Sequence, residues 1–178
     1  MRWLTRILIG IVLVLAAFAV LVALQPSAFK VTRTANVAAP PDKVFAAVND
    51  FHRWQDWSPW AKLDPNAKAM FEGPGAGKGA MFDWSGNDKI GEGRMEIKDS
   101  HPSDHIAIKI DFVKPMAGTA DTDFTFKPDG SGTAVSWTMS GEDGFIGKAM
   151  RFFMNIDKMI GDDFDKGLAQ LKSVAEAK

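Results

Sequence analysis

The chain has 178 residues, enough for one ordinary domain rather than two. Hydrophobic residues make up 46% and charged residues 24%, a globular balance that excludes a disordered chain. The formal net charge of -1 disfavours a basic nucleic-acid-binding protein, so no nucleic-acid partner is expected. The absence of cysteine excludes disulfides, cysteine nucleophiles and cysteine-ligated metal sites.

An uncharged apolar run extends from Ile7 to Leu24. As a helix it would cover ~27 Å, just enough to cross the hydrocarbon core of a bilayer. We therefore expect one membrane-spanning helix and a folded domain beyond it. The predicted organisation is a short tail over 1–6, a transmembrane helix over 7–24, a linker over 25–28 and a domain over 29–176.

The charges around the apolar run bear on its orientation. Arg2 and Arg6 precede it and favour a cytoplasmic N-terminus, with the domain exported to the periplasmic or extracellular side; Lys30 and Arg33 beyond it count against this. A cleaved signal peptide, which would leave a secreted domain, is the alternative because it has the same charged start. The anchor is preferred because no small-residue cleavage site follows Leu24.

A strand and two short helical segments are predicted at the start of the domain. The alternation of apolar residues over 29–37 predicts the strand. Pro41 and Asp42 suit the first turn of a helix, where a missing N–H costs nothing and a carboxylate meets the positive end of the helix dipole. Trp54 and Trp57 indicate a second helical turn, whose length Pro59 limits.

From residue 68 to 141 the apolar pattern has a period of two, interrupted by turns rich in Gly, Asn and Asp. This predicts an antiparallel meander with one covered and one wet face. The residues expected to face the C-terminal helix are Ile108, Ile110, Phe124, Val135 and Trp137, and those expected to face away are Lys109, Asp121, Asp123, Ser136 and Thr138.

The last predicted element is one long helix from Phe145 to Ala175. Its apolar residues recur at steps of mostly three and four, which gives a broad apolar stripe. Gly161 and Gly167 interrupt this pattern, and each costs ~1 kcal/mol relative to Ala in a helix interior. A bend, or close approach of the helix to the sheet, would explain them.

Two segments carry a family resemblance: 39–45 (APPDKVF) and 54–60 (WQDWSPW), followed by six strands and a long helix ending over 163–172. This combination resembles the START-related helix-grip superfamily, specifically the bacterial SRPBCC group with its polyketide cyclase/dehydrase-like proteins. The resemblance implies an α+β helix-grip fold. In that fold a curved seven-stranded antiparallel sheet wraps around the C-terminal helix, with an apolar cavity between them. Family members bind lipids, sterols, polyketides or hormones, and some catalyse cyclisation. No shared catalytic motif accompanies the resemblance, so no catalytic residue is assigned.

No cofactor is expected. In the glycine-rich run over 73–79, Lys78 is followed by Gly rather than Ser or Thr, and Glu72 stands where a phosphate loop needs Gly. The formal match to a dinucleotide fingerprint is followed by a strand instead of a helix. A tight turn accounts for this run.

No metal site is expected either. His101 and His105 flank a turn that contains Pro102, without a third histidine nearby, and a solvated turn is the better interpretation. Asp162 and Asp163 are adjacent on a helix and therefore point ~100° apart, so they do not serve one site as acid and base.

Methionine and aromatic side chains dominate the predicted cavity. Methionine adapts to varied apolar ligands, although plain core packing is the competing interpretation. Loops near Trp57 and Pro115 are expected to form the mouth. The predicted ligand-binding residues are Met150, Phe153, Met154 and Asp157 on the helix, with Phe82, Trp84, Met95, Ile108, Ile110 and Trp137 on the strands.

The leading functional hypothesis is a membrane-anchored domain that binds an apolar or amphipathic small molecule, lipid-like or polyketide-like, in the cavity. One alternative is an enzyme of cyclase/dehydratase type, for which Asp157, Asp83 and Arg94 are the polar candidates. Another is an anchored interaction module whose cavity is filled by its own side chains. A cavity of ~300 Å³ or more would separate the first two from the third.

Overall fold

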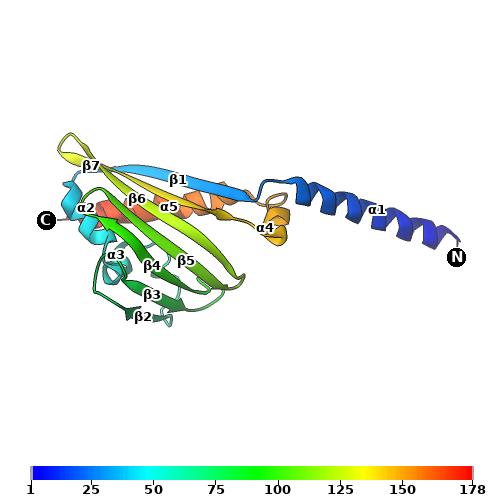
Figure 1. Cartoon of the computed structure of the whole chain (residues 1–178), viewed down its shortest axis with the longest axis horizontal. Helices are drawn as coiled ribbons and strands as arrows, with labels where there is room; N and C mark the ends of the chain where they lie inside the picture. The colour runs from blue at the N-terminus through cyan, green and yellow to red at the C-terminus, as the bar shows by residue number, and fades with distance from the viewer. Residues whose placement is uncertain (1, 178) are drawn as a thin grey trace. The chain divides into compact units, whose positions relative to one another are not determined.

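The computed structural model describes residues 2–177. The chain forms two compact units, which we describe separately: the residues up to 29 with 142–155, and 30–141 with the residues from 156 on. Figure 1 shows the elements, which are α1 (Arg2–Leu24), β1 (Ala28–Val37), α2 (Pro41–Val48), a 3-10 turn (Phe51–Arg53), α3 (Trp54–Trp57), β2 (Lys68–Glu72), β3 (Met81–Ser85), β4 (Glu92–His101), β5 (His105–Lys114), β6 (Gly118–Asp129), β7 (Gly132–Glu142), α4 (Phe145–Met150) and α5 (Ile156–Glu176).

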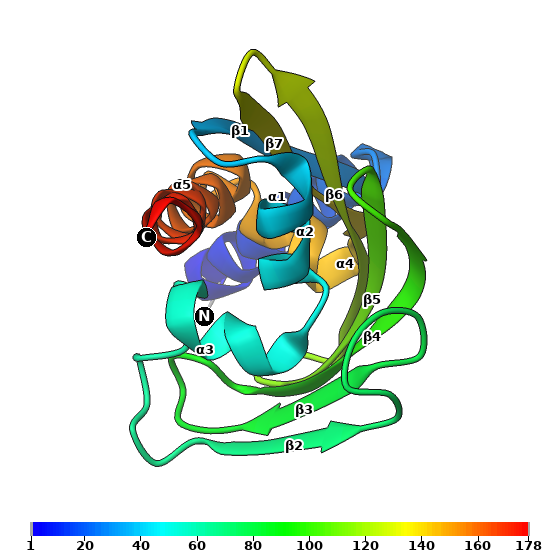
Figure 2. The ribbon, with the colours of Figure 1, turned by 90° about the vertical axis from the view of Figure 1, so that its left-hand side faces the viewer.

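Seven strands form one curved sheet in the order β1-β7-β6-β5-β4-β3-β2, so the chain runs as a meander from β2 to β7 and places β1 beside β7. The pairs from β2 to β7 are antiparallel. Viewed end-on, the sheet curves around α2, α3 and α5, which lie on its concave side (Figure 2). The α+β helix-grip architecture predicted from the sequence is confirmed.

The strand register agrees with the predicted faces. Each of the five residues expected to face the helix is at most 6% exposed. On the other face, the side chains of Lys109 and Asp123 are 43% and 39% exposed. A slip of one residue would have moved the inward-facing residues to the outer face and the outward-facing ones to the inner face. The period-two pattern therefore predicted the two faces correctly.

The prediction of one helix from Phe145 to Ala175 is wrong, because the helix is interrupted over residues 151–155. α4 ends at Met150, three residues turn, and α5 starts at Ile156. The break contains neither Gly nor Pro, and the apolar residues keep their helical spacing across it. Periodicity alone therefore does not reveal it. Asn155, a residue type that favours helix N-caps, immediately precedes α5 and is the local sequence signal for the new start.

α1 begins at Arg2, so the segment expected to be a tail is helical as well. No Gly or Pro separates Arg6 from the apolar run, and the helix continues through it. Its mean hydropathy is 3.3 over an 18-residue window. The helix is therefore long and apolar enough to cross a membrane, although a signal sequence can meet the same criteria of length and composition.

Two glycines seat α5 on the structure around it. A Cβ on Gly161 would overlap the guanidinium of Arg33, which crosses the helix from β1. A Cβ on Gly167 would lie 2.7 Å from Cζ3 of Trp137 and 3.0 Å from Cδ of Pro59. Close approach therefore explains both glycines, as one of the two sequence interpretations proposed.

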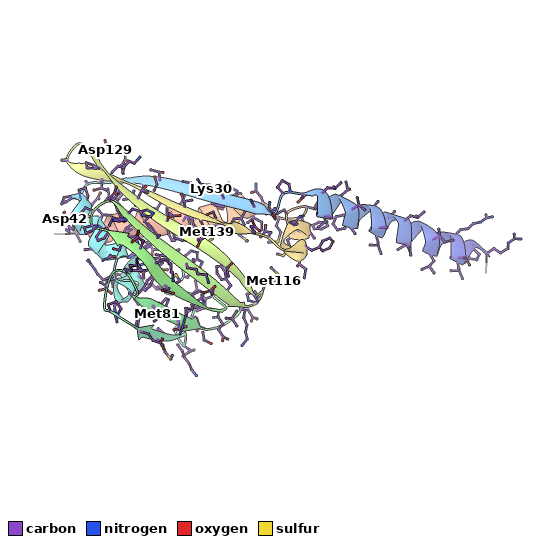
Figure 3. The ribbon with its side chains drawn as sticks, viewed as in Figure 1. Lys30, Asp42, Met81, Met116, Asp129 and Met139 are labelled. Carbon is purple, nitrogen blue, oxygen red and sulfur yellow. The ribbon has the colours of Figure 1, made fainter. Side chains whose placement is uncertain are left out.

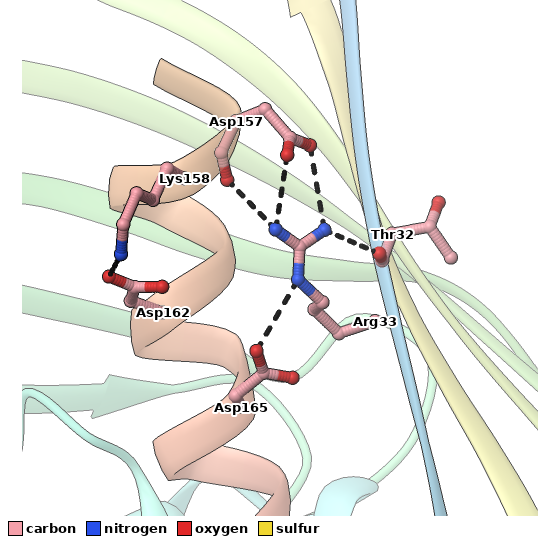
Figure 4. Close-up of polar contacts among 6 residues, drawn as sticks. All are labelled: Thr32, Arg33, Asp157, Lys158, Asp162 and Asp165. Carbon is pink, nitrogen blue, oxygen red and sulfur yellow. Dashed lines mark hydrogen bonds and ion pairs between the residues drawn. The ribbon is translucent and has the colours of Figure 1, made fainter. Parts of the chain in front are cut away.

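Arg33 ties the edge strand to α5 (Figure 4). Its Nη2 donates to Oδ2 and to the main-chain carbonyl of Asp157, at 3.1 Å each, and its Nε lies 3.4 Å from Oδ2 of Asp165. Nη1 donates to the carbonyl of Thr32 at 2.8 Å. The hydrogen bond with Asp157 is the main cause that raises the pKa of Arg33. The guanidinium therefore remains charged and joins the two elements.

Gly167→Ala should lower the free energy of unfolding by about 1–3 kcal/mol, because the new methyl group meets rigid rings in the core. At an unhindered helix position the same change would raise stability by roughly 0.5–1 kcal/mol. Gly161→Ala is the matched comparison and should cost less, because the Arg33 side chain can move aside. Urea unfolding followed by tryptophan fluorescence measures both; a Gly167→Ala variant as stable as the wild type would contradict the close approach.

The carboxylate of Glu176 joins the end of α5 to Ala38 through a contact whose strength depends on pH. It accepts a 2.6 Å hydrogen bond from the backbone N–H of Ala38 and pairs with Lys172, and the Ala38 bond is the main cause that lowers its pKa below the ordinary 4.5. A lowered folded-state pKa means that the stabilisation is present above pH 4.5 and is lost as the pH falls below it. Glu176→Gln should therefore be less stable than the wild type at pH 7 and equally stable at low pH; a pH-independent difference would contradict this.

Candidate functional site

The concave side of the sheet presents a continuous apolar surface, here called the inner face. The antiparallel register aligns its members into rows: Phe82 pairs with Met95, which pairs with Ile110, and Ile97 pairs with Ile108. All six strand residues predicted to bind ligand belong to this face. It comprises Ala69, Phe71, Phe82, Trp84, Gly93, Met95, Ile97, Ile106, Ile108, Ile110, Phe112, Ala120, Thr122, Phe124, Phe126, Val135, Trp137 and Met139.

One end of the inner face, the sealed end, is packed with aromatic rings. Trp137 stacks on Phe164 of α5 with ring centroids 4.0 Å apart, and on Phe124 at 4.9 Å. Trp54 and Trp57 meet Trp137 edge-on and anchor α3 to α2 through indole N–H bonds to the main chain. These rings fill the space between this part of the sheet and α5, as the core-packing interpretation requires.

Trp57 is fully buried in this cluster, so its side chain belongs to the core and not to a cavity rim; that the loop near it forms a mouth stays a prediction. A spacing of three residues along a helix shows that Trp54 and Trp57 share a side, but not which side of the helix is covered. Pro115, the other predicted mouth residue, lies in the connection between β5 and β6. Met116, next to it in the same connection, is exposed (Figure 3).

The opposite end, here called the open end, consists of Phe71, Phe82, Trp84, Gly93 and Phe112. Phe71 is 36% exposed, and Phe82, Trp84 and Phe112 are half-buried. Their rings form a chain of contacts at 5.2, 6.1 and 6.1 Å, in strand order from β2 to β5. A Cβ on Gly93 would lie 2.5 Å from the Trp84 ring, so this glycine lets the indole lie flat on β4. An apolar aromatic surface therefore remains accessible here.

Two buried polar atoms on the inner face have no hydrogen-bond partner among residues 2–177. They are Oγ1 of Thr122 and Nε1 of Trp137, in residues that are each 1% exposed. Thr122 pairs with Met139 and Phe124 pairs with Trp137, so Thr122 and Trp137 are diagonal neighbours on β6 and β7. A buried group left unsatisfied costs about 1–3 kcal/mol. The inner face thus offers one N–H donor and one hydroxyl side by side.

Three predicted helix residues lie outside α5. The stripe that was expected to join Met150, Phe153 and Met154 to Phe164 is broken by the turn over 151–155, so no continuous helix places them opposite the sheet. Phe153 is 78% and Met154 41% exposed. Asp157 is in the first turn of α5, where its carboxylate is engaged by Arg33.

The polar residues considered for catalysis are also paired. Arg94 donates to Asp83 at 2.6 and 2.9 Å, and these bonds are the main cause that raises the pKa of Arg94. Both side chains have the parity opposite to Phe82 and Met95, so they are on the outer face of the sheet. The geometry brings neither residue to the inner face.

The histidines of the 101–105 turn pair with separate carboxylates: His101 with Asp99 at 2.9 Å and His105 with Asp123 at 2.8 Å. Within residues 2–177 no three His, Asp or Glu side chains are grouped as a metal would require.

A small surface pocket of about 170 Å³ lies beside β2, where Phe51, His52 and Phe71 meet the loop after Glu72. His52 stacks on Phe71 there with ring centroids 4.0 Å apart. None of the ten predicted ligand-binding residues lines this pocket.

The curved sheet, the seated α5 and the apolar inner face define a helix-grip α+β domain. Residues 28–176 match the family described as polyketide cyclase / dehydrase and lipid transport, and the chain belongs to this family. The match covers nearly all of the chain beyond α1 and bears out the resemblance drawn from the sequence. The comparison with curated proteins finds no match.

Solved structures share the fold at low sequence identity. A protein from Rhizobium leguminosarum superposes with a TM-score of 0.63 at 15% identity, over 86% of this chain and 98% of its own. Protein CV1439 from Chromobacterium violaceum gives 0.61 at 16%, over 84% and 98%. The di-domain ARO/CYC protein BexL from the BE-7585A biosynthetic pathway gives 0.61 at 18%, over 100% of this chain and 61% of BexL. At these identities the likeness concerns the fold.

Proposed function

We propose that this protein binds an apolar or amphipathic small molecule, lipid-like or polyketide-like, on the inner face, while α1 holds the domain to a membrane. The observation that carries the proposal is the contrast along the inner face. The sealed end is filled by rings from α3 and α5, whereas the open end leaves Phe82, Trp84 and Phe112 partly exposed. Accessible aromatic surface on a concave apolar wall is typical of small-molecule sites.

The two unsatisfied polar atoms are not part of the proposed site. Nε1 of Trp137 and Oγ1 of Thr122 belong to residues that are each 1% exposed, and rings from α3 and α5 cover Trp137. The proposed ligand contacts are therefore the partly exposed rings of the open end.

Binding is favoured over the cyclase/dehydratase alternative because of where the polar pairs lie. Acid–base catalysis needs a titratable group within hydrogen-bond reach of the substrate. Asp83 and Arg94 are on the outer face, and Asp157 is engaged by Arg33. The family and the ARO/CYC structural neighbours keep the enzyme as the second candidate.

The proposed anchor rests on α1, which has no charged residue from Ile7 to Leu24. A helix of this kind in a water-soluble unit would have to be covered, and in this structure its large side chains are mostly more than half exposed. The arginines at its N-terminal end favour the exported side for the domain. The alternative is a secreted form of the domain from which α1 has been cleaved.

A photoactivatable fatty acid should cross-link to the inner face of the full-length protein in vesicles. Peptides from β3 to β5 should carry the label, separately from any lipid label on α1. Phe112→Asp should abolish the β3–β5 label, because it places a charge on the open end. Val113→Asp is the matched control, since Val113 is 52% exposed, and should keep the label. Thermal melts confirm that both variants are folded; equal labelling of the two would contradict the site.

The full-length protein should fractionate with membranes and resist carbonate extraction, because the apolar α1 would leave water for the bilayer. Mass spectrometry of the mature N-terminus gives the independent readout. A free protein beginning near residue 25 would replace the anchor by a cleaved signal.

A further inference from the structure

The segment after β7 displays an unusual set of exposed apolar side chains, which we call the apolar tip. Exposed fractions within it range from 41% to 78%. Soluble surfaces seldom collect so many large apolar groups in ten residues, and such patches mark contact with a partner or a membrane. The apolar tip consists of Phe145, Ile146, Phe152, Phe153 and Met154.

The apolar tip belongs to the same compact unit as α1 and packs on it. The ring of Phe18 lies 5.3 Å from Phe152 and 6.0 Å from Phe153, centroid to centroid. Phe18 is six residues before the end of α1 at Leu24, which corresponds to ~9 Å along the helix axis. Phe152 and Phe153 are therefore level with apolar turns of α1, not with the linker that follows it.

The charged side chains of the same segment lie at a different level. Arg151 donates to the carbonyls of Ser27 at 2.7 Å and Pro26 at 3.3 Å, just past the end of α1, and pairs with Asp143. Lys148 donates to the carbonyl of Ala23, in the last turn of α1, at 2.8 Å. Charges thus gather at the end of α1, and apolar rings lie deeper along it. This is the division of an amphipathic element at a membrane surface.

We propose that the apolar tip inserts into the bilayer leaflet beside the C-terminal end of α1 as a second membrane contact. The inference rests on the proposed anchoring by α1, which sets the depth: if α1 spans the bilayer, side chains level with Phe18 are ~9 Å inside the helix end. Interfacial segments bury their apolar faces by ~5–10 Å. The bonds of Arg151 to the carbonyls just past α1, and of Lys148 to the carbonyl of Ala23, hold the segment beside the end of α1.

The chain contains no cysteine, so single-cysteine labelling tests the depth of each position in the full-length protein. An environment-sensitive fluorophore is attached to Phe153→Cys or Ile146→Cys, in phosphatidylcholine vesicles with spin-labelled lipids. Leu13→Cys, in the middle of the apolar run, reports on α1. Ser131→Cys, exposed in the turn between β6 and β7, reports on a water-exposed position.

The expected result is a blue-shifted label at Phe153 and Ile146, quenched at least two-fold more strongly than at Ser131, with spin labels near the headgroup the most effective. Leu13 should be quenched best by spin labels near the bilayer centre. Quenching at Leu13 with none at Phe153 and Ile146 would overturn the apolar tip while the anchor stands. Absence of quenching at Leu13 would overturn the anchor and the tip together. A blue shift at Phe153 without lipid quenching would show cover by protein, such as a second copy, and would also overturn the inference.

Discussion

The close seating of α5 is the constraint on which the rest of the domain depends. Gly167 lets the helix backbone approach Trp137 and Pro59, and Gly161 leaves room for Arg33 to cross from the edge strand. Each glycine costs ~1 kcal/mol of helix propensity, which the core contacts must offset. The close approach lets Phe164 stack on Trp137 with ring centroids 4.0 Å apart. It also lets Asp157 and Asp165 both pair with the guanidinium of Arg33. The helix is thereby fixed at both the core and the edge of the sheet.

Because α5, α2 and α3 converge on the sealed end, the packing that stabilises the fold and the proposed ligand contact lie on different parts of one surface. The rings of Trp54, Trp57 and Phe124 surround Trp137 and leave no apolar atoms there for a ligand. The open end contributes less to the core, since Phe71, Phe82, Trp84 and Phe112 keep exposed surface. Substitutions at the sealed end should therefore impair folding, whereas substitutions at the open end should impair the proposed binding.

The sequence predicts what is periodic and local, and it fails where partners are distant. Alternation gave the faces of β4 to β7, because a strand with one covered side must repeat every two residues. The break before α5 is not predictable from periodicity, because residues 151–155 keep the apolar spacing and contain no helix breaker, leaving Asn155 as the one local signal. Arg33 shares its parity with Val31, but the carboxylates that make an inward-facing arginine tolerable are more than a hundred residues away. The six strand residues of the candidate site were therefore predictable as a shared face, whereas the surroundings of Met150, Phe153 and Met154 were not.

The break between α4 and α5 has a consequence for chemistry as well as for geometry. In one continuous helix, Phe153 and Met154 would have continued the stripe that includes Phe164 and packed toward the sheet. The turn releases them from that stripe, and the rings of Phe152 and Phe153 meet Phe18 of α1 instead. Arg151 makes this placement tolerable, because Asp143 and main-chain carbonyls neutralise and saturate its guanidinium next to apolar surface. The same residues that periodicity assigns to a core thus become, through one interrupted helix, the exposed surface for which we propose contact with lipid.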